Sequence, residues 1–177
     1  DQQKVVDLIN IAVDSIFASN IPHAKKLMEQ SLEISERIDF VTGRGMYERM
    51  LGYIAQTNGD IPTALTHFYK TLELYAQDGY HDGIAAVKID LGQIAQDAGD
   101  IQKARRYFTE SQQLYQQMND TSGVAANYIN LGMVYAAEKN YDANLANLQK
   151  AAELFKILRD TLRLGIAYNN SAPMYFL

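Results

Sequence analysis

The stretch Leu51-Gly52-Tyr53-Ile54-Ala55-Gln56-Thr57-Asn58-Gly59-Asp60-Ile61 occurs three times in the chain. It returns as Leu91-Gly92-Gln93-Ile94-Ala95-Gln96-Asp97-Ala98-Gly99-Asp100-Ile101, and in a weaker form as Leu131-Gly132-Met133-Val134-Tyr135-Ala136-Ala137-Glu138-Lys139-Asn140-Tyr141. Successive copies begin 40 residues apart. A fixed period between about 20 and 50 residues is the mark of a repeat array, so this stretch decides the fold.

The residues around each copy predict a pair of helices, because apolar residues recur there at helical spacing. Pro22 and Pro62 are also 40 residues apart. Each suits the first turn of a helix, where the missing N–H has no partner to lose. The sequence further predicts helix caps at Asp60, Asp100 and Asn140, helices that open at Gly43, Gly83 and Gly123, and a ninth helix from about Thr161.

One column of glycines, Gly52, Gly92 and Gly132, falls in the middle of predicted helices. Glycine in a helix interior costs about 0.5–1 kcal/mol relative to alanine, so three glycines at one position need a packing reason. The simplest reason is a close backbone approach between the two helices of a pair.

These residues resemble the tetratricopeptide repeat family. Helix A of that family carries an apolar residue, then a small one, as in Leu91-Gly92. Helix B carries a small residue and an aromatic residue four positions later, as in Ala64 with Phe68. The resemblance implies an all-α, right-handed superhelix of helical hairpins, a solenoid of four helix pairs and one extra C-terminal helix. It implies a single array over residues 1–177, with units at about 3–40, 43–80, 83–120 and 123–160 and a half unit at 161–177.

The period of 40 exceeds the commoner 34 of this family. In this respect the chain is similar to kinesin-light-chain-type repeats and to the sensor or regulatory arms of bacterial signalling proteins. The outer units depart from the family pattern at some positions, including Asp14 among apolar neighbours and Pro173 inside the last predicted helix. Met28 stands where helix B has its aromatic residue, and Asn144 stands in place of the alanine.

In the family, helix A lines a concave groove that binds partners. The resemblance therefore implies partner-binding positions at Arg49, Tyr53, Gln56, Asp90, Gln93, Asp97, Asn130, Met133, Asn170 and Phe176. Asparagine both donates and accepts hydrogen bonds, so Asn130 and Asn170 are able to grip a peptide backbone, although a plain helix-surface role fits them equally well. Tyr53 and Met133 are candidate anchors for apolar side chains of the partner, or packing residues between adjacent helices.

The charges of this groove argue against a clamp for acidic chain ends. Arg49 is the single basic residue among these positions, and Asp90 and Asp97 would repel a carboxylate. An extended peptide with a basic or neutral centre and an apolar end fits the groove better.

Composition excludes several other classes of function. The formal net charge of −5 and the pI of about 5.1 argue against a nucleic-acid partner and against direct contact with an anionic membrane surface. The chain has no cysteine, and none of its three histidines is spaced to pair with another as metal ligands. No phosphate-binding loop or nucleophile elbow occurs, so we expect no metal, no cofactor and no catalytic site.

The sequence thus predicts a protein- or peptide-binding scaffold, as the sensor or interaction arm of a larger bacterial signalling or transcription-regulatory protein. The alternative is a self-association module that forms a homodimer through the uncovered C-terminal helix, where Ile166, Tyr168 and Phe176 would leave an apolar patch. We expect a cytoplasmic location ahead of a periplasmic sensor region.

Overall fold

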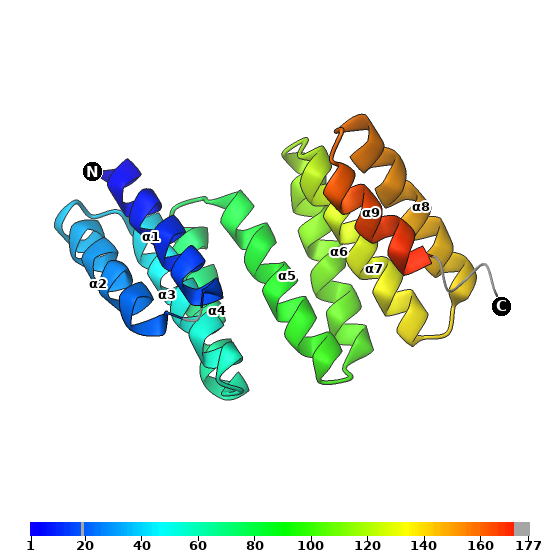
Figure 1. Cartoon of the computed structure of the whole chain (residues 1–177). Coiled ribbons are helices and arrows are strands. Elements are labelled where there is room, and N and C mark those ends of the chain that lie inside the picture. The colour runs from blue at the N-terminus through cyan, green and yellow to red at the C-terminus, as the bar shows by residue number, and fades with distance from the viewer. Residues whose placement is uncertain (19, 172–177) are drawn as a thin grey trace. The chain divides into compact units, whose positions relative to one another are not determined.

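The computed structural model describes residues 1–18 and 20–171, apart from the side chain of Phe17. Over these residues nine helices and no strand are found (Figure 1). The helices are α1 (Gln2–Phe17), α2 (Ile21–Arg37), α3 (Val41–Thr57), α4 (Ile61–Gln77), α5 (His81–Asp97), α6 (Ile101–Gln117), α7 (Thr121–Ala137), α8 (Tyr141–Ile157) and α9 (Thr161–Ser171). The predicted all-α class, with helical hairpins as its unit, is confirmed.

The helices fall into two compact units, Asp1–Val87 and Lys88–Leu177, and the boundary lies within α5. In the first unit α1 packs against α2 and α3 packs against α4, while α3 also contacts α1 and α2. In the second unit α7 packs between α6 and α8, and α9 packs against α8. Each unit therefore contains hairpins of the A and B type that the repeat predicts.

Links of three residues join the helices, and α2 to α8 each contain 17 residues. The middle residue of the described links has a positive φ, which is 76° at Gly59 and 59° at Lys139. The third residue bonds back across the link, as the N–H of Asp60 does to the carbonyl of Ala55 at 2.9 Å. This is the Schellman arrangement, which satisfies carbonyls at the end of a helix.

Where the third link residue is an aspartate or an asparagine, it also caps the next helix. A side-chain oxygen of Asp60 accepts from the N–H of Thr63 at 3.2 Å, and Asp100 and Asn140 accept in the same way from Lys103 and Ala143. The three predicted caps are confirmed, as is the place of Pro22 and Pro62 in the first turns of α2 and α4. One residue thus completes one helix and starts another.

The prediction that Gly43, Gly83 and Gly123 open helices is wrong by two residues. The helices begin at Val41, His81 and Thr121. The glycines are required because helix B of the preceding hairpin lies against them. A Cβ atom at Gly83 would lie 2.5 Å from the ring of Tyr75, and one at Gly123 would lie 2.4 Å from the ring of Tyr115.

The glycine column within the A helices has a different packing reason from the predicted backbone contact. A Cβ atom at Gly52 would lie 2.7 Å from the ring of Phe68, and one at Gly92 would lie 2.5 Å from the ring of Phe108. Both rings are fully buried. The glycine therefore makes room for a phenylalanine side chain of helix B, and the close partner is this ring.

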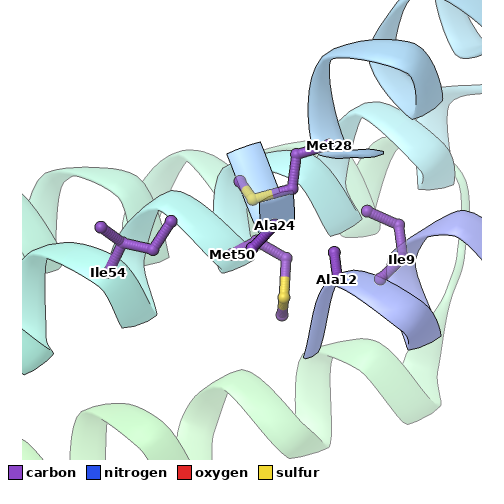
Figure 2. Close-up of a cluster of buried hydrophobic side chains, with 6 residues drawn as sticks. All are labelled: Ile9, Ala12, Ala24, Met28, Met50 and Ile54. Carbon is purple, nitrogen blue, oxygen red and sulfur yellow. The ribbon is translucent and has the colours of Figure 1, made fainter. Parts of the chain in front are cut away.

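In the first and the last hairpin, side chains of other sizes make the equivalent contact between helix A and helix B. In the first unit Ala12 takes the glycine position and Met28 takes the phenylalanine position, within a buried cluster that also holds Ile9, Ala24, Met50 and Ile54 (Figure 2). In the second unit a Cβ atom at Gly132 would meet the smaller Leu148 at 3.3 Å. A smaller side chain on helix B thus leaves space for a larger one on helix A, as close packing requires.

The departure at Asn144 adds one buried hydrogen bond between the helices of its hairpin. Its side chain is 3% exposed, and its Nδ2 donates to the carbonyl of Gly132 at 2.7 Å. The asparagine thus ties helix B to the backbone of helix A at the place where other hairpins have alanine.

The start of α3 is capped from another helix, because the side chain of Phe40 makes no capping hydrogen bond. Asp78, which follows α4, accepts from the N–H of Thr42 at 3.2 Å and from the hydroxyl of Thr42 as well. This cap fixes the end of α4 against the beginning of α3.

Candidate partner-binding face

The first unit presents a face built from the two A helices α1 and α3. Between them lies the buried cluster to which Ile9 and Ala12 of α1 and Met50 and Ile54 of α3 contribute (Figure 2). Residues next to this cluster, such as Val13 and Tyr53, are partly buried and pack on its outer side. We name this surface the α1/α3 face.

A cavity of about 410 Å³ lies on the α1/α3 face. Its lining residues are Val13, Ile16, Arg49, Met50, Tyr53 and Thr57. Its volume falls within the usual range of ligand pockets, which are mostly apolar with a few polar groups. Four of the six lining side chains are apolar or aromatic, so the cavity is suited to an apolar side chain of a partner.

Two residues predicted to bind a partner, Arg49 and Tyr53, meet in this cavity. The guanidinium carbon of Arg49 lies 5.2 Å from the centroid of the Tyr53 ring, within the range of a cation–π contact. The Tyr53 ring also packs edge-on against Phe68, with 5.5 Å between the ring centroids. Tyr53 is thus held in place before any partner arrives, which lowers the entropy cost of binding.

A second, smaller cavity of about 170 Å³ shares Val13, Arg49 and Met50 with the first. It extends past Asn10 to Tyr80 and Asp82. The Tyr80 hydroxyl donates to Asp82 Oδ2 at 3.3 Å. Burial and the Asp82 charge raise the pKa of Tyr80, and Arg49 opposes them. The hydroxyl therefore stays protonated near neutral pH and adds a polar group to the edge of the face.

The other predicted positions lie outside these cavities. Gln56 is partly buried on α3, one turn beyond Tyr53. In the second unit Asp90, Gln93 and Asp97 lie on α5, and Gln93 Nε2 donates to Asp97 Oδ1 at 3.1 Å. Asn130 and Met133 lie on α7, where Met133 is 39% exposed, and Asn170 is partly buried on α9. Phe176 lies outside the described residues.

Sequence reasoning missed Val13 and Ile16, because the groove positions were carried over only from the second repeat onward. The signal was present. Val13 and Ile16 stand 40 residues before Tyr53 and Gln56, so they occupy the same two columns. Extending the columns into the first repeat would have found both.

Over residues 1–18 and 20–171, no group of three or more histidine, aspartate and glutamate side chains is placed to hold a metal ion. In the same residues no helix is long and apolar enough to cross a membrane. The α1/α3 face offers contact area, one cation and hydrogen-bonding groups, which suits recognition of a partner.

Helical hairpins repeated every 40 residues, with a small residue on helix A under a large one on helix B, define a helical-repeat protein of the hairpin type. Residues 44–117 match the family model described as tetratricopeptide repeat. Over this stretch the chain is similar to the tetratricopeptide repeat family. Domains of this family generally bind proteins or peptides.

Two solved structures share the fold. The crystal structure of BtubC (BKLC) from P. vanneervenii is 18% identical, with a TM-score of 0.73 over 94% of this chain and 73% of that chain. The second is a Signal Transduction ATPase with Numerous Domains (STAND) protein with a tetratricopeptide repeat sensor, from Pyrococcus horikoshii. It is 20% identical, with a TM-score of 0.78. The match covers 97% of this chain and 27% of that chain. No curated protein matched the sequence.

Proposed function

We propose that the chain is a non-catalytic scaffold that binds a protein or an extended peptide on the α1/α3 face. The cavity of about 410 Å³ between Val13, Ile16 and Tyr53 carries this proposal, because it offers an apolar recess beside a fixed aromatic ring. Burying one aliphatic or aromatic side chain there contributes about 1.5–3 kcal/mol to binding. Contacts with the rest of the peptide supply the remaining affinity.

The remaining positions predicted from the sequence are further candidate contacts for the peptide. In this proposal Gln56, Asp90, Gln93 and Asp97 contact a basic or neutral stretch of the peptide. Asn130 and Asn170 hydrogen-bond its backbone, and Met133 and Phe176 contact an apolar end. Arg49 on α3 and Asp90 and Asp97 on α5 carry opposite charges, which supports a partner of mixed charge.

We further propose that the chain serves as the sensor or interaction arm of a larger signalling or regulatory protein. The structural match to a STAND protein with a tetratricopeptide repeat sensor supports this proposal, since the chain spans 27% of that protein. A scaffold that binds a partner on one face is suited to control a domain attached to it.

Display of random 12-residue peptides against the chain tests the binding proposal. We expect selected peptides with an apolar or aromatic residue, and the variants Tyr53→Ala and Val13→Asp should each weaken them about 5- to 30-fold. Tyr141→Ser is the matched control, because Tyr141 is 44% exposed on α8 in the other unit. The proposal fails if the peptides bind both face variants as tightly as the unchanged chain.

Self-association through α9 is the second candidate function. Leu162, Ile166 and Tyr168 on this helix are 77%, 44% and 56% exposed, which is unusual for large apolar side chains and favours an interface. Light scattering over a concentration series tests it. A dimer that Leu162→Glu dissociates would support self-association, and a monomer at all concentrations would exclude it.

A further inference from the structure

The hairpin of α7 and α8, the yellow and orange helices of Figure 1, buries two asparagine side chains. Asn127 of α7 is fully buried, and Asn144 of α8 is 3% exposed. Over residues 1–18 and 20–171, these are the only buried side chains that hold a buried polar atom without a hydrogen bond, and in each the atom is Oδ1. A buried amide oxygen without a partner costs more free energy than an added hydrogen bond contributes. Both side chains therefore weaken this hairpin.

The hydrogen bonds of Asn127 leave its oxygen aside. Its Nδ2 donates to Ser111 Oγ at 3.0 Å and to the carbonyl of Gly123 at 3.2 Å. The positions 40 residues earlier hold Thr71 and Val87, both fully buried. The Thr71 hydroxyl donates within its own helix at 2.9 Å. A valine beside a hydroxyl thus fits this position without an unpaired amide oxygen.

Asn144 belongs to a set of three packing residues that differs between hairpins. The set is a glycine on helix A with an alanine and a phenylalanine on helix B: Gly52, Ala64 and Phe68 in α3 and α4, and Gly92, Ala104 and Phe108 in α5 and α6. In α7 and α8 the set is Gly132, Asn144 and Leu148. The α7/α8 hairpin therefore has a smaller apolar side chain and a buried amide where the two preceding hairpins have a ring and a methyl group.

The link inside this hairpin differs as well. Lys139 joins α7 to α8 with a φ of 59°. Gly59 and Gly99 occupy the same place in the two preceding hairpins, with φ values of 76° and 78°. The left-handed conformation is unfavourable for a residue with a Cβ atom and costs glycine nothing in steric terms. Three separate features thus weaken the same hairpin.

We propose that the α7/α8 hairpin is a conformational device that opens locally while the α3/α4 hairpin stays folded. The free energy of local opening varies along a structure and is lowest where packing and hydrogen bonding are weakest. Opening separates Leu131 and Val134 of α7 from Phe108 of α6, with which they share a buried cluster. The open state therefore exposes apolar surface that the closed state covers, and such a change between order and disorder is one way in which proteins switch. The device is independent of the proposed peptide-binding cavity, which lies on α1 and α3.

Amide hydrogen exchange of the intact chain, read by mass spectrometry after pepsin digestion, tests this proposal. We expect the amides of α7 and α8 to exchange about tenfold faster than those of α3 and α4. Asn127→Val should slow exchange in α7 and α8 about threefold or more, with little change in α3 and α4. Valine and asparagine have similar helix propensities, so this effect reports the buried amide. The double variant Asn144→Ala, Leu148→Phe restores the packing set of the preceding hairpins and should slow exchange at least as much.

Asn147→Ala is the matched control on α8. The Nδ2 of Asn147 donates to the carbonyl of Ala143 one turn earlier at 2.8 Å, and Asn147 is only partly buried. This variant measures the gain in helix propensity from asparagine to alanine, and we expect a smaller slowing. The proposal is overturned if α7 and α8 exchange as slowly as α3 and α4 in the unchanged chain. It is also overturned if neither Asn127→Val nor the double variant slows exchange in α7 and α8 more than Asn147→Ala does.

Discussion

Replacing Gly92 with alanine adds one methyl group where the structure leaves no room for it. The new Cβ atom would lie 2.5, 2.8 and 3.0 Å from three atoms of the Phe108 ring, which is fully buried. Carbon atoms prefer separations of about 3.5–4.0 Å, so the ring or the helix must shift. Overpacking of this kind costs about 1–3 kcal/mol.

Two other glycines provide the scale for this substitution. Alanine in place of a helical glycine gains about 1 kcal/mol of helix propensity wherever it is made. At Gly165, in α9, an added Cβ atom has no neighbour within 4 Å, so Gly165→Ala should show this gain alone. At Gly132 the nearest atoms of Leu148 lie at 3.3 Å, which predicts an intermediate result. The difference between Gly92→Ala and Gly165→Ala should equal the packing cost, about 1–3 kcal/mol.

Urea unfolding followed by circular dichroism at 222 nm measures the three free energies of unfolding. For a chain of this length, 1 kcal/mol corresponds to a shift in Tm of about 2–4 °C, so a thermal scan provides a second reading. Unchanged m-values among the variants would show that the same cooperative transition is compared. This check matters because repeat arrays can unfold in parts.

A second substitution tests whether Phe108 is the cause. Phe108→Leu reproduces the Gly132–Leu148 pair, so alanine at position 92 should then be tolerated, with a coupling energy of about 1–2 kcal/mol between the two changes. The reasoning is refuted if Gly92→Ala stabilises the chain as much as Gly165→Ala. Strictly additive changes at positions 92 and 108 would also refute it.

Three further predictions concern the links and caps. Lys139→Gly should stabilise the chain by about 0.5–1 kcal/mol in urea unfolding, because Lys139 has a φ of 59°, a left-handed conformation that glycine adopts at no steric cost. Asp78→Ala should cost about 0.5–2 kcal/mol by the same assay, because the N–H of Thr42 loses its cap. Hydrogen bonds from Thr63 lower the pKa of the Asp60 carboxyl from its ordinary value of 3.8. The stabilisation of the fold by the ionised Asp60 is therefore present above pH 3.8 and is lost as the pH falls below this value. The stability advantage of the unchanged chain over Asp60→Asn should therefore disappear in acid denaturation.

Much of the fold could be predicted because its signals are local. Asp60, Asp100 and Asn140 cap helices through atoms three residues away, and Pro22 and Pro62 act within a single turn. The period of 40 residues then places equivalent positions in each hairpin without knowledge of contacts. Arg49 and Tyr53 could also be predicted to lie together, because residues four apart on a helix share a face.

The errors arise where a contact joins separate helices. The sequence does not show that Tyr75 and Tyr115 lie over Gly83 and Gly123, so these glycines are easily mistaken for helix starts. It does not show that Asp78 replaces the cap missing at Phe40. The size of a cavity depends on how side chains from two helices pack, which explains why the recess beside Tyr53 became evident only in three dimensions.

The three-residue link has a consequence for how such a chain changes length. Asp60 and Asp100 each finish one helix and begin the next, at equivalent links inside two successive hairpins. A duplication or deletion of 40 residues between equivalent joints leaves no new helix end to stabilise, whereas a change of any other length breaks a joint. Unequal recombination can therefore add or remove whole hairpins at little structural cost, and each added hairpin brings new surface side chains that are open to selection.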